Sequence, residues 1–166
     1  MKRIIALSDS HGDVNALRDA LDLAAKRGKI NAVVFLGDGA ADFEQIRPSL
    51  VKQGIQCHVV RGNNDWSSRE EAEILFSVNG VKIFATHGHM WHVKYGIERL
   101  WFAAREREAQ VALYGHTHRE KIDLEYNITF VNPGAVCEHY GKNRSAYAEI
   151  LVEDNGFVIP SLCYWD

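Results

Sequence analysis

Residues 3–12 read RIIALSDSHG, an isoleucine-rich apolar run that passes directly into a polar segment containing Asp9 and His11. A short continuous apolar run of this kind predicts a buried strand over Arg3 to Leu7. Asp13 then caps a predicted helix, because the apolar residues that follow it recur at helical spacing. The chain therefore opens as a strand, a polar loop and a helix.

The same order repeats further along the chain. Ala32 to Leu36 and Ile55 to Val60 are short apolar runs that predict two more strands, each followed by glycine. Between them, Phe43 to Leu50 predicts a short helix that bends near Pro48. Because strands alternate with helices, we expect parallel strands joined by right-handed crossovers.

The second half is richer in strands. Asn79-Gly80 separates two apolar runs, 74–78 and 81–85, and this dipeptide predicts a two-residue hairpin with a type I′ turn. The remaining predicted elements are a helix over 93–109, a strand over 111–114, a hairpin of 121–125 with 128–131, and two closing strands, 146–152 and 157–162. The pattern predicts an α/β protein in which two mixed sheets pack face to face with helices outside.

The composition is that of one globular domain. The chain has 166 residues, of which 46% are hydrophobic and 25% charged, and this excludes a mostly disordered chain. A net charge of −3 argues against a general binder of nucleic acid or anionic membranes. The opening apolar run, Ile4 to Leu7, is shorter than the roughly 7–15 residues of a signal peptide. No stretch approaches the roughly 20 apolar residues of a spanning helix.

Histidine is the one unusual feature of this composition. The chain has eight histidines but only three cysteines, and the cysteines lack the spacing of a zinc site or a disulfide framework. We therefore expect a cytoplasmic protein, for which a reducing compartment is the default.

A polar motif follows each of five predicted strands. In open α/β sheets, binding sites form where the carboxyl ends of strands meet, so we expect these motifs to converge. The five motifs are Asp9-Ser10-His11, Gly37-Asp38, Gly62-Asn63-Asn64-Asp65, Thr86-His87-Gly88-His89 and Gly115-His116-Thr117-His118.

The motifs together supply metal ligands without any thiolate. Oxygen and nitrogen donors of this mixture suit Mn, Fe, Zn, Ni or Co, and we favour manganese. Seven ligands are too many for one ion but fit two divalent ions if one carboxylate bridges them. Two such ions clamp the attacking and leaving oxygens of an in-line phosphoryl displacement. The candidate ligands are Asp9, His11, Asp38, Asn63, His87, His116 and His118.

These five motifs, in this order over residues 9–118, resemble the calcineurin-like metallophosphoesterase superfamily, and most closely its small bacterial and archaeal phosphodiesterases. Asn132-Pro133-Gly134 extends the resemblance and is expected to shape a loop under the site. The resemblance implies a single metallophosphoesterase domain over 1–166. It also implies a four-layer αββα sandwich of two mixed sheets flanked by helices, with a two-metal site.

The resemblance also implies a role for each ligand. One ion would be held by Asp9, His11, Asp38 and His118, and the second by Asp38, Asn63, His87 and His116, so that Asp38 bridges them. Asp38, Asn63 and His87 are then the expected catalytic residues, acting on a hydroxide that bridges the metals and on the phosphoryl oxygens.

The chain departs from larger family members at Asn64. Many of them have histidine there, which is thought to help the leaving group, and an asparagine cannot donate a proton as an acid. Either His89 or His92 replaces it, or the enzyme prefers leaving groups that need little protonation. Asp65 is expected to orient a neighbouring ligand.

Three further residues need a separate interpretation. Arg119 follows His118 directly and either contacts a substrate phosphate or is solvent-exposed or ion-paired. His58 lies inside a predicted strand and is expected to be structural. His139 lies in an irregular segment, from which it either reaches the site or does not.

The sequence thus predicts a metal-dependent phosphoesterase, and more specifically a phosphodiesterase of a small phosphate ester. Two alternatives stay open: a phosphomonoesterase using the same site, and a non-catalytic protein-binding scaffold like the retromer subunit with this fold. A nuclease ranks low, because the chain is acidic and too short for an added nucleic-acid-binding domain. The oligomeric state, including a homo-oligomer, is also left open.

Overall fold

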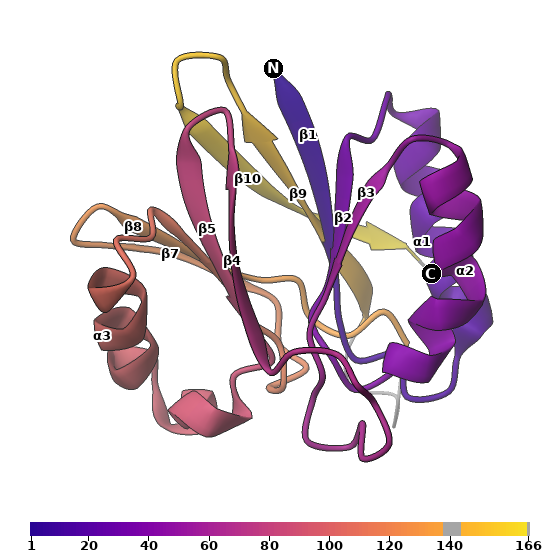
Figure 1. The fold of residues 1–166 in the computed structure, drawn as a ribbon, viewed down its shortest axis with the longest axis horizontal. Helices are drawn as coiled ribbons and strands as arrows, with labels where there is room; N and C mark the ends of the chain where they lie inside the picture. The colour runs from indigo at the N-terminus through magenta and orange to yellow at the C-terminus, as the bar shows by residue number, and fades with distance from the viewer. Residues whose placement is uncertain (138–143, 166) are drawn as a thin grey trace.

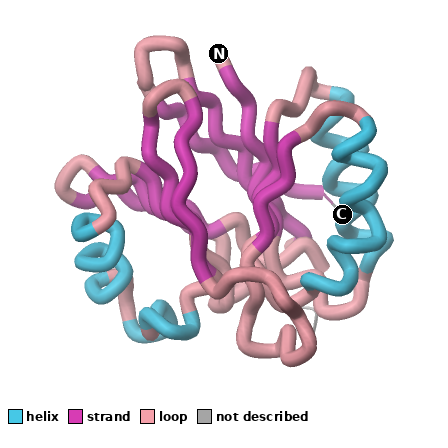
Figure 2. The backbone as a smooth tube through the Cα atoms, viewed as in Figure 1, coloured by secondary structure: helices cyan, strands magenta, loops and turns pink. Residues whose placement is uncertain are grey.

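The computed structural model of the protein describes residues 1–137 and 144–165. Within them, two five-stranded sheets pack against each other, and helices cover the two outer faces (Figures 1 and 2). The layers are thus helix, sheet, sheet and helix. This arrangement confirms the predicted four-layer αββα sandwich of two mixed sheets.

The first sheet contains the parallel strands predicted from the first half of the chain. Its strand order is β10-β9-β1-β2-β3, in which β1 pairs in parallel with β2 and antiparallel with β9. Helices α1 (Val14–Lys26) and α2 (Ala40–Lys52) cover its outer face (Figure 1). The strands are β1 (Lys2–Leu7), β2 (Ala32–Phe35), β3 (Gln56–Val59), β9 (Ser145–Val152) and β10 (Val158–Trp165).

The second sheet has the order β4-β5-β6-β8-β7, and α3 (Glu98–Glu106) packs on its outer face. Asn79 and Gly80 join β4 to β5 with φ angles of 47° and 77°, as the predicted type I′ turn requires. The strands are β4 (Glu73–Val78), β5 (Val81–Thr86), β6 (Val111–Leu113), β7 (Lys121–Glu125) and β8 (Ile128–Asn132).

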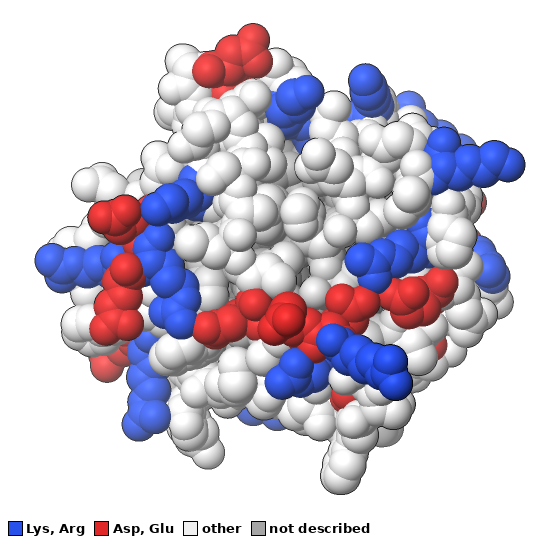
Figure 3. Space-filling view, viewed as in Figure 1, with Lys and Arg blue, Asp and Glu red and all other residues white. Residues whose placement is uncertain are grey.

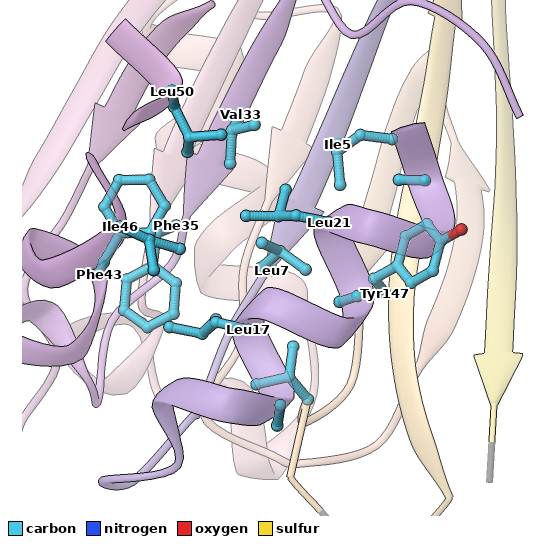
Figure 4. Packing of buried hydrophobic residues seen from close by; sticks show 14 of the residues in the cluster. Ile5, Leu7, Leu17, Leu21, Val33, Phe35, Phe43, Ile46, Leu50 and Tyr147 are labelled. Atoms are coloured by element: carbon cyan, nitrogen blue, oxygen red, sulfur yellow. The ribbon is translucent and has the colours of Figure 1, made fainter. Parts of the chain in front are cut away.

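Strand β1 is apolar throughout because both of its faces are buried. Ile5 and Leu7 pack against the helices, in a core where the Phe35 and Phe43 rings stack with centroids 5.3 Å apart (Figure 4). Residues of the other face, such as Ile4, join the core between the two sheets. A strand enclosed on both faces reads as a continuous apolar run rather than an alternating one.

The helix predicted over 93–109 is wrong in its first part. The chain instead forms two single 3₁₀ turns, His89–Trp91 and Val93–Tyr95, before α3 begins at Glu98. Gly96, between the second turn and α3, has a φ of 128°, which lies outside the α-helical range. Among the described helices, none combines the length and apolar character needed to cross a membrane.

Helix α2 is longer than predicted because its first turn is stabilised by a residue far along the chain. It begins at Ala40 rather than Phe43. Asp65 Oδ1 accepts the backbone N–H groups of Gly39 (2.9 Å) and Ala40 (3.0 Å), and Oδ2 accepts those of Asp38 and Gly62, both at 2.7 Å. The carboxylate thereby satisfies donors at the helix N-terminus, where negative charge is also favoured.

Replacement of Asp65 by asparagine tests this role. An amide keeps one accepting oxygen but turns an NH₂ toward two of the four N–H groups, so we expect Asp65→Asn to lose about 3 kcal/mol of unfolding free energy. Urea denaturation measures the loss. The matched control is Asp13→Asn at the N-cap of α1, where asparagine caps as well as aspartate. Equal stability of the two variants would contradict the role.

Candidate metal centre

The five polar motifs lie in loops at one end of the two sheets. Asp9 follows β1, Asp38 follows β2 and His87 follows β5 directly, while His116 and His118 follow β6. These loops meet at the lower end of the view in Figure 1, opposite the N-terminus. The convergence expected from the sequence is therefore present.

Six of the seven candidate ligands form two groups of three. In the first, Asp9 Oδ1 lies 3.4 Å from His11 Nε2 and 3.3 Å from His118 Nε2. In each group, one ligand atom from every residue lies within 4.8 Å of the other two, as a shared cation requires. The second group is Asp38, His87 and His116.

The two groups adjoin each other. In the second group, His87 Nε2 lies 3.3 Å from Asp38 Oδ2 and 3.2 Å from His116 Nδ1. Across the groups, Asp38 Oδ2 lies 3.9 Å from His11 Nε2, and Asp9 Oδ1 lies 4.0 Å from His87 Nε2. Asp38 thus lies at the junction, where a bridging ligand would have to be.

Asp9 provides the best test of whether a cation fits. Its side chain is fully buried. Oδ2 accepts hydrogen bonds from the Ser8 hydroxyl (2.5 Å) and the His116 backbone N–H (3.1 Å). Oδ1 has no hydrogen-bond partner among the described residues and faces imidazole nitrogens instead. A buried carboxylate oxygen left in this state is costly, and a metal ion would satisfy it.

The pKa values of the two carboxyls keep them charged. Burial alone would raise the pKa of Asp9, but the His11 and His118 side chains outweigh burial and hold it well below its usual range. Burial likewise opposes the shift of Asp38, yet His87 and Asn64 lower its pKa to about 2. Ionised carboxylates are the form that binds metal.

Two histidines of the second group have environments that suit coordination. Burial is the main cause that lowers the pKa of His116 to about 4, so this imidazole is neutral. The Nδ1–H of His87 donates to the Leu36 carbonyl at 2.7 Å. This bond fixes the ring and leaves Nε2 directed at the site, as outer partners of metal-bound histidines do.

The backbone at the candidate ligands is strained. Left-handed conformations cost residues with a Cβ roughly 1–2 kcal/mol each. Such strain persists where the surrounding structure requires it, and it clusters at functional sites. Five of the seven candidate ligands have positive φ: Asp9 (58°), His11 (44°), Asp38 (57°), His116 (69°) and His118 (60°).

Glycines let the loops approach each other closely. Gly37 has a φ of 99°, and a Cβ on it would lie 2.6 Å from the Gly62 backbone nitrogen. A Cβ on Gly62 would overlap the Asp38 carboxylate. The loops after β2 and β3 therefore contact each other through backbone. A side chain at Gly62 would displace Asp38, and one at Gly37 would displace Gly62 or the His87 ring.

The remaining residues of the β3–β4 loop have different environments. Asn63 is exposed. Asn64 donates its backbone N–H to Asp38 Oδ1 (2.9 Å) and its side-chain amide to Oδ2 (2.8 Å). Asp65 accepts the Asp38 backbone N–H, so it contacts the neighbouring ligand that it was expected to orient. Ligation by Asn63 stays a prediction.

His89 lies beside the second group, whereas His92 does not join it. The His89 ring centroid is 5.5 Å from that of His87 and 6.1 Å from that of His116. Its buried Nδ1 has no hydrogen-bond partner among the described residues. His92 is exposed at the end of a 3₁₀ turn, and Arg119 is exposed beside His118.

The other two histidines do not enter the described site. The His58 ring stacks on Phe76, with centroids 3.9 Å apart, and so has the structural setting expected of it. His139 lies outside the described residues.

Sequence reasoning missed a buried acid that supports the first loop. Asp42 Oδ2 accepts the Ser10 hydroxyl (2.7 Å) and the Gly12 backbone N–H (2.8 Å). Its position could have indicated that it is buried, because Asp42 precedes Ile46 by one helical turn on the buried face of α2.

Asn132 supports the loop after β6, as expected of the Asn-Pro-Gly segment. Its amide nitrogen donates to the Gly115 carbonyl (3.1 Å) and to Thr117 Oγ1 (2.9 Å). Its amide oxygen accepts the Gly134 N–H at 2.9 Å. Asn132 is itself almost completely buried, so it fixes the backbone between two candidate ligands.

The strain at His118 can be measured by comparing two substitutions. Both His118→Gly and His118→Ala remove the imidazole, but only alanine retains the Cβ that opposes a φ of 60°. After chelation of metals, we expect the glycine variant to be more stable than the alanine variant, with a free energy of unfolding about 1 kcal/mol higher.

The control for this comparison is Arg18, which is exposed within α1. There the order must reverse, with glycine less stable than alanine by about 1 kcal/mol. If glycine were the less stable residue at both positions, the backbone at His118 would not be strained.

Comparison with known proteins places this chain in a family. Residues 1–155 match the model of the calcineurin-like phosphoesterase superfamily domain. The probable metallophosphoesterase YsnB of Bacillus subtilis is 26% identical over 94% of this chain and 88% of its own length. Phosphodiesterase YfcE of Escherichia coli is 29% identical over 89% of this chain and 86% of its own.

Solved structures agree with this assignment. A Streptococcus pneumoniae protein described as a predicted phosphoesterase is 32% identical, with a TM-score of 0.72 over 90% of this chain and 82% of its own. Vps29 of Entamoeba histolytica, solved with zinc, has a TM-score of 0.72 over 98% of both chains at 18% identity, which shows a shared fold alone. From the match over residues 1–155 and the fold, the chain belongs to the calcineurin-like phosphoesterase superfamily.

Proposed function

We propose that this protein is a binuclear metal-dependent phosphodiesterase that hydrolyses a small phosphate ester. The observation that supports this most strongly is the pair of adjoining ligand groups, with Asp38 at their junction. Membership of a phosphoesterase superfamily supports the same reaction class. We further infer that residues 1–166 act as one domain.

The residues divide between two divalent ions. Asp9, His11 and His118 would hold one, while His87, His116 and Asn63 would hold the other, with Asp38 shared. Bound there, divalent ions supply Lewis acidity toward the phosphoryl oxygens and lower the pKa of water. Nitrogen and oxygen donors favour manganese, with nickel, cobalt, iron and zinc as alternatives. Zinc accompanies the Vps29 structure of the same fold.

Asn63 and His87 are assigned to the phosphoryl oxygens, whose charge they would stabilise. Asn64 does not act as an acid, because an amide does not release a proton; its backbone and side-chain N–H groups instead form hydrogen bonds to Asp38. We therefore propose that the enzyme prefers esters whose leaving group departs with little protonation, such as aryl phosphodiesters.

Two alternatives differ from this proposal in activity. A phosphomonoesterase would use the same ligands, and no described residue discriminates the single extra charge of a monoester. A scaffold would resemble Vps29, whose likeness to this chain concerns the fold alone. The complete set of Asp and His ligands favours an enzyme over a scaffold.

The surface and the cysteines support two further parts of the proposal. The face in Figure 3 carries acidic and basic side chains interspersed, with a band of acids across it, which is unlike the basic surface of a nucleic-acid-binding protein. Cys57, Cys137 and Cys163 are free, which supports a reducing, cytoplasmic location.

Asp38→Asn tests the proposed function. The amide keeps the shape of the side chain but removes the shared negative charge, so we expect hydrolysis of bis(p-nitrophenyl) phosphate with Mn²⁺ to fall about a thousandfold. Metal content after dialysis, measured by emission spectrometry, should fall as well. The matched control is Asp22→Asn on the exposed face of α1, which should keep both.

Full activity of Asp38→Asn would refute the assignment. A panel of mono- and diesters, assayed with Mn, Ni, Co, Zn and Mg after chelation, separates the alternatives. Faster turnover of p-nitrophenyl phosphate would identify a phosphomonoesterase, and no metal-dependent turnover of any ester would identify a scaffold.

A further inference from the structure

A cavity of about 580 Å³ opens beside the candidate metal centre, between the second 3₁₀ turn and the loop after β6. Lys94 and Ile97 line it from one side, and Thr117, Arg119 and Lys121 line it from the other. Tyr114 also lines it, from the end of β6. None of these residues belongs to the two ligand groups.

The loop after β6 brings the cavity next to the candidate metal centre. Thr117, which lines the cavity, lies in the chain between His116 and His118, which belong to different ligand groups. Arg119, which also lines it, directly follows His118. A substrate bound at the metals would therefore have this cavity as its neighbour.

The charge of the cavity is positive. Among the described residues, no carboxylate forms an ion pair with Lys94 or Arg119, whereas Lys121 pairs with Asp123 at 3.5 Å. Glu120 follows Arg119 but is not among the residues that line the cavity. Two cationic side chains thus remain uncompensated at one opening.

A neutral hydrogen-bond donor accompanies these charges, because the Tyr114 phenol lines the cavity. The Thr117 hydroxyl lines it as well but donates its proton to the Arg119 carbonyl at 3.3 Å. Guanidinium, ammonium and hydroxyl donors together are the set that proteins use to bind phosphoryl groups.

Two other large cavities differ in charge. The first, at the opposite end of the first sheet, is lined by Lys2, Lys29 and the acidic Asp22. The second lies against α3 and places Glu108 with Arg105. Of these three cavities, the one beside the metal centre alone combines basic residues with no acidic lining residue.

We propose that this cavity binds a second phosphoryl group of the substrate, so that the substrate is a phosphodiester whose alcohol portion carries a further phosphate. The proposal rests on the phosphodiesterase function and adds the substrate class to it. Arg119 and Lys94 bind the distal phosphate while the scissile diester lies at the metals. Arg119 thereby contacts substrate rather than only solvent.

A matched pair of substrates tests the proposal. Thymidine 3′-phosphate 5′-(p-nitrophenyl phosphate) carries the second phosphoryl group, and thymidine 5′-(p-nitrophenyl phosphate) lacks it. We expect kcat/KM to be about tenfold higher for the first substrate, mainly through a lower KM. Charge-assisted hydrogen bonds to the second phosphate strengthen substrate binding, and a tenfold change in affinity is a modest effect for such contacts. In a Lys94→Gln, Arg119→Gln double variant the ratio should fall to about one.

The control is a Lys2→Gln, Lys29→Gln double variant, which removes the same charge at the distant cavity. It should keep the tenfold ratio. A ratio near one in the unsubstituted protein would overturn the proposal, and so would a tenfold ratio that survives the Lys94→Gln, Arg119→Gln changes.

A binding measurement without metals separates this proposal from the proposed function. Inorganic phosphate is titrated into the chelated protein, and the backbone amides of Thr117 and Arg119 are followed by NMR. Saturable shifts that vanish in the Lys94→Gln, Arg119→Gln variant support the phosphate site. Their absence overturns it, whatever the hydrolysis assays show. If neither ester is hydrolysed, the phosphodiesterase function fails instead.

Discussion

The interaction on which the rest of the structure depends is the burial of the Asp9 carboxylate at the end of the central strand β1. One of its oxygens is satisfied by Ser8 and the His116 backbone, while the other faces imidazoles without a hydrogen bond among the described residues. An ionised group in this setting is stable only beside positive charge. The loops after β2, β5 and β6 place histidines and a second carboxylate near Asp9, and these side chains could hold a cation there.

The convergence of these loops requires local backbone strain, which the packing of the four layers maintains. Candidate ligands such as Asp38 and His118 adopt left-handed backbone conformations, and Gly37 and Gly62 meet with no room for side chains. The apolar cores on both faces of the first sheet supply the rigidity to hold these loops. Asp65 links the two requirements, because one carboxylate orders the start of α2 and the backbone of Asp38.

The layered architecture and the loops that contain the candidate ligands could be predicted from the sequence, because both depend on local sequence patterns. Apolar runs ending in polar motifs predicted the strands of the first sheet and the convergence after them. Contacts between distant segments were not predictable in this way. The start of α2 depends on Asp65, 25 residues beyond Ala40, and the support from Asp42 requires the loop after β1 to pack against α2. The break before α3 depends on the φ of Gly96.

The central claim, that two metal ions share Asp38, is tested most directly by anomalous X-ray diffraction from crystals grown with Mn²⁺. Data collected at the manganese absorption edge locate the ions independently of any assay. The account predicts two peaks, one among Asp9, His11 and His118 and one among His87, His116 and Asn63, with Asp38 contacting both. A single peak, or peaks away from these side chains, would contradict it.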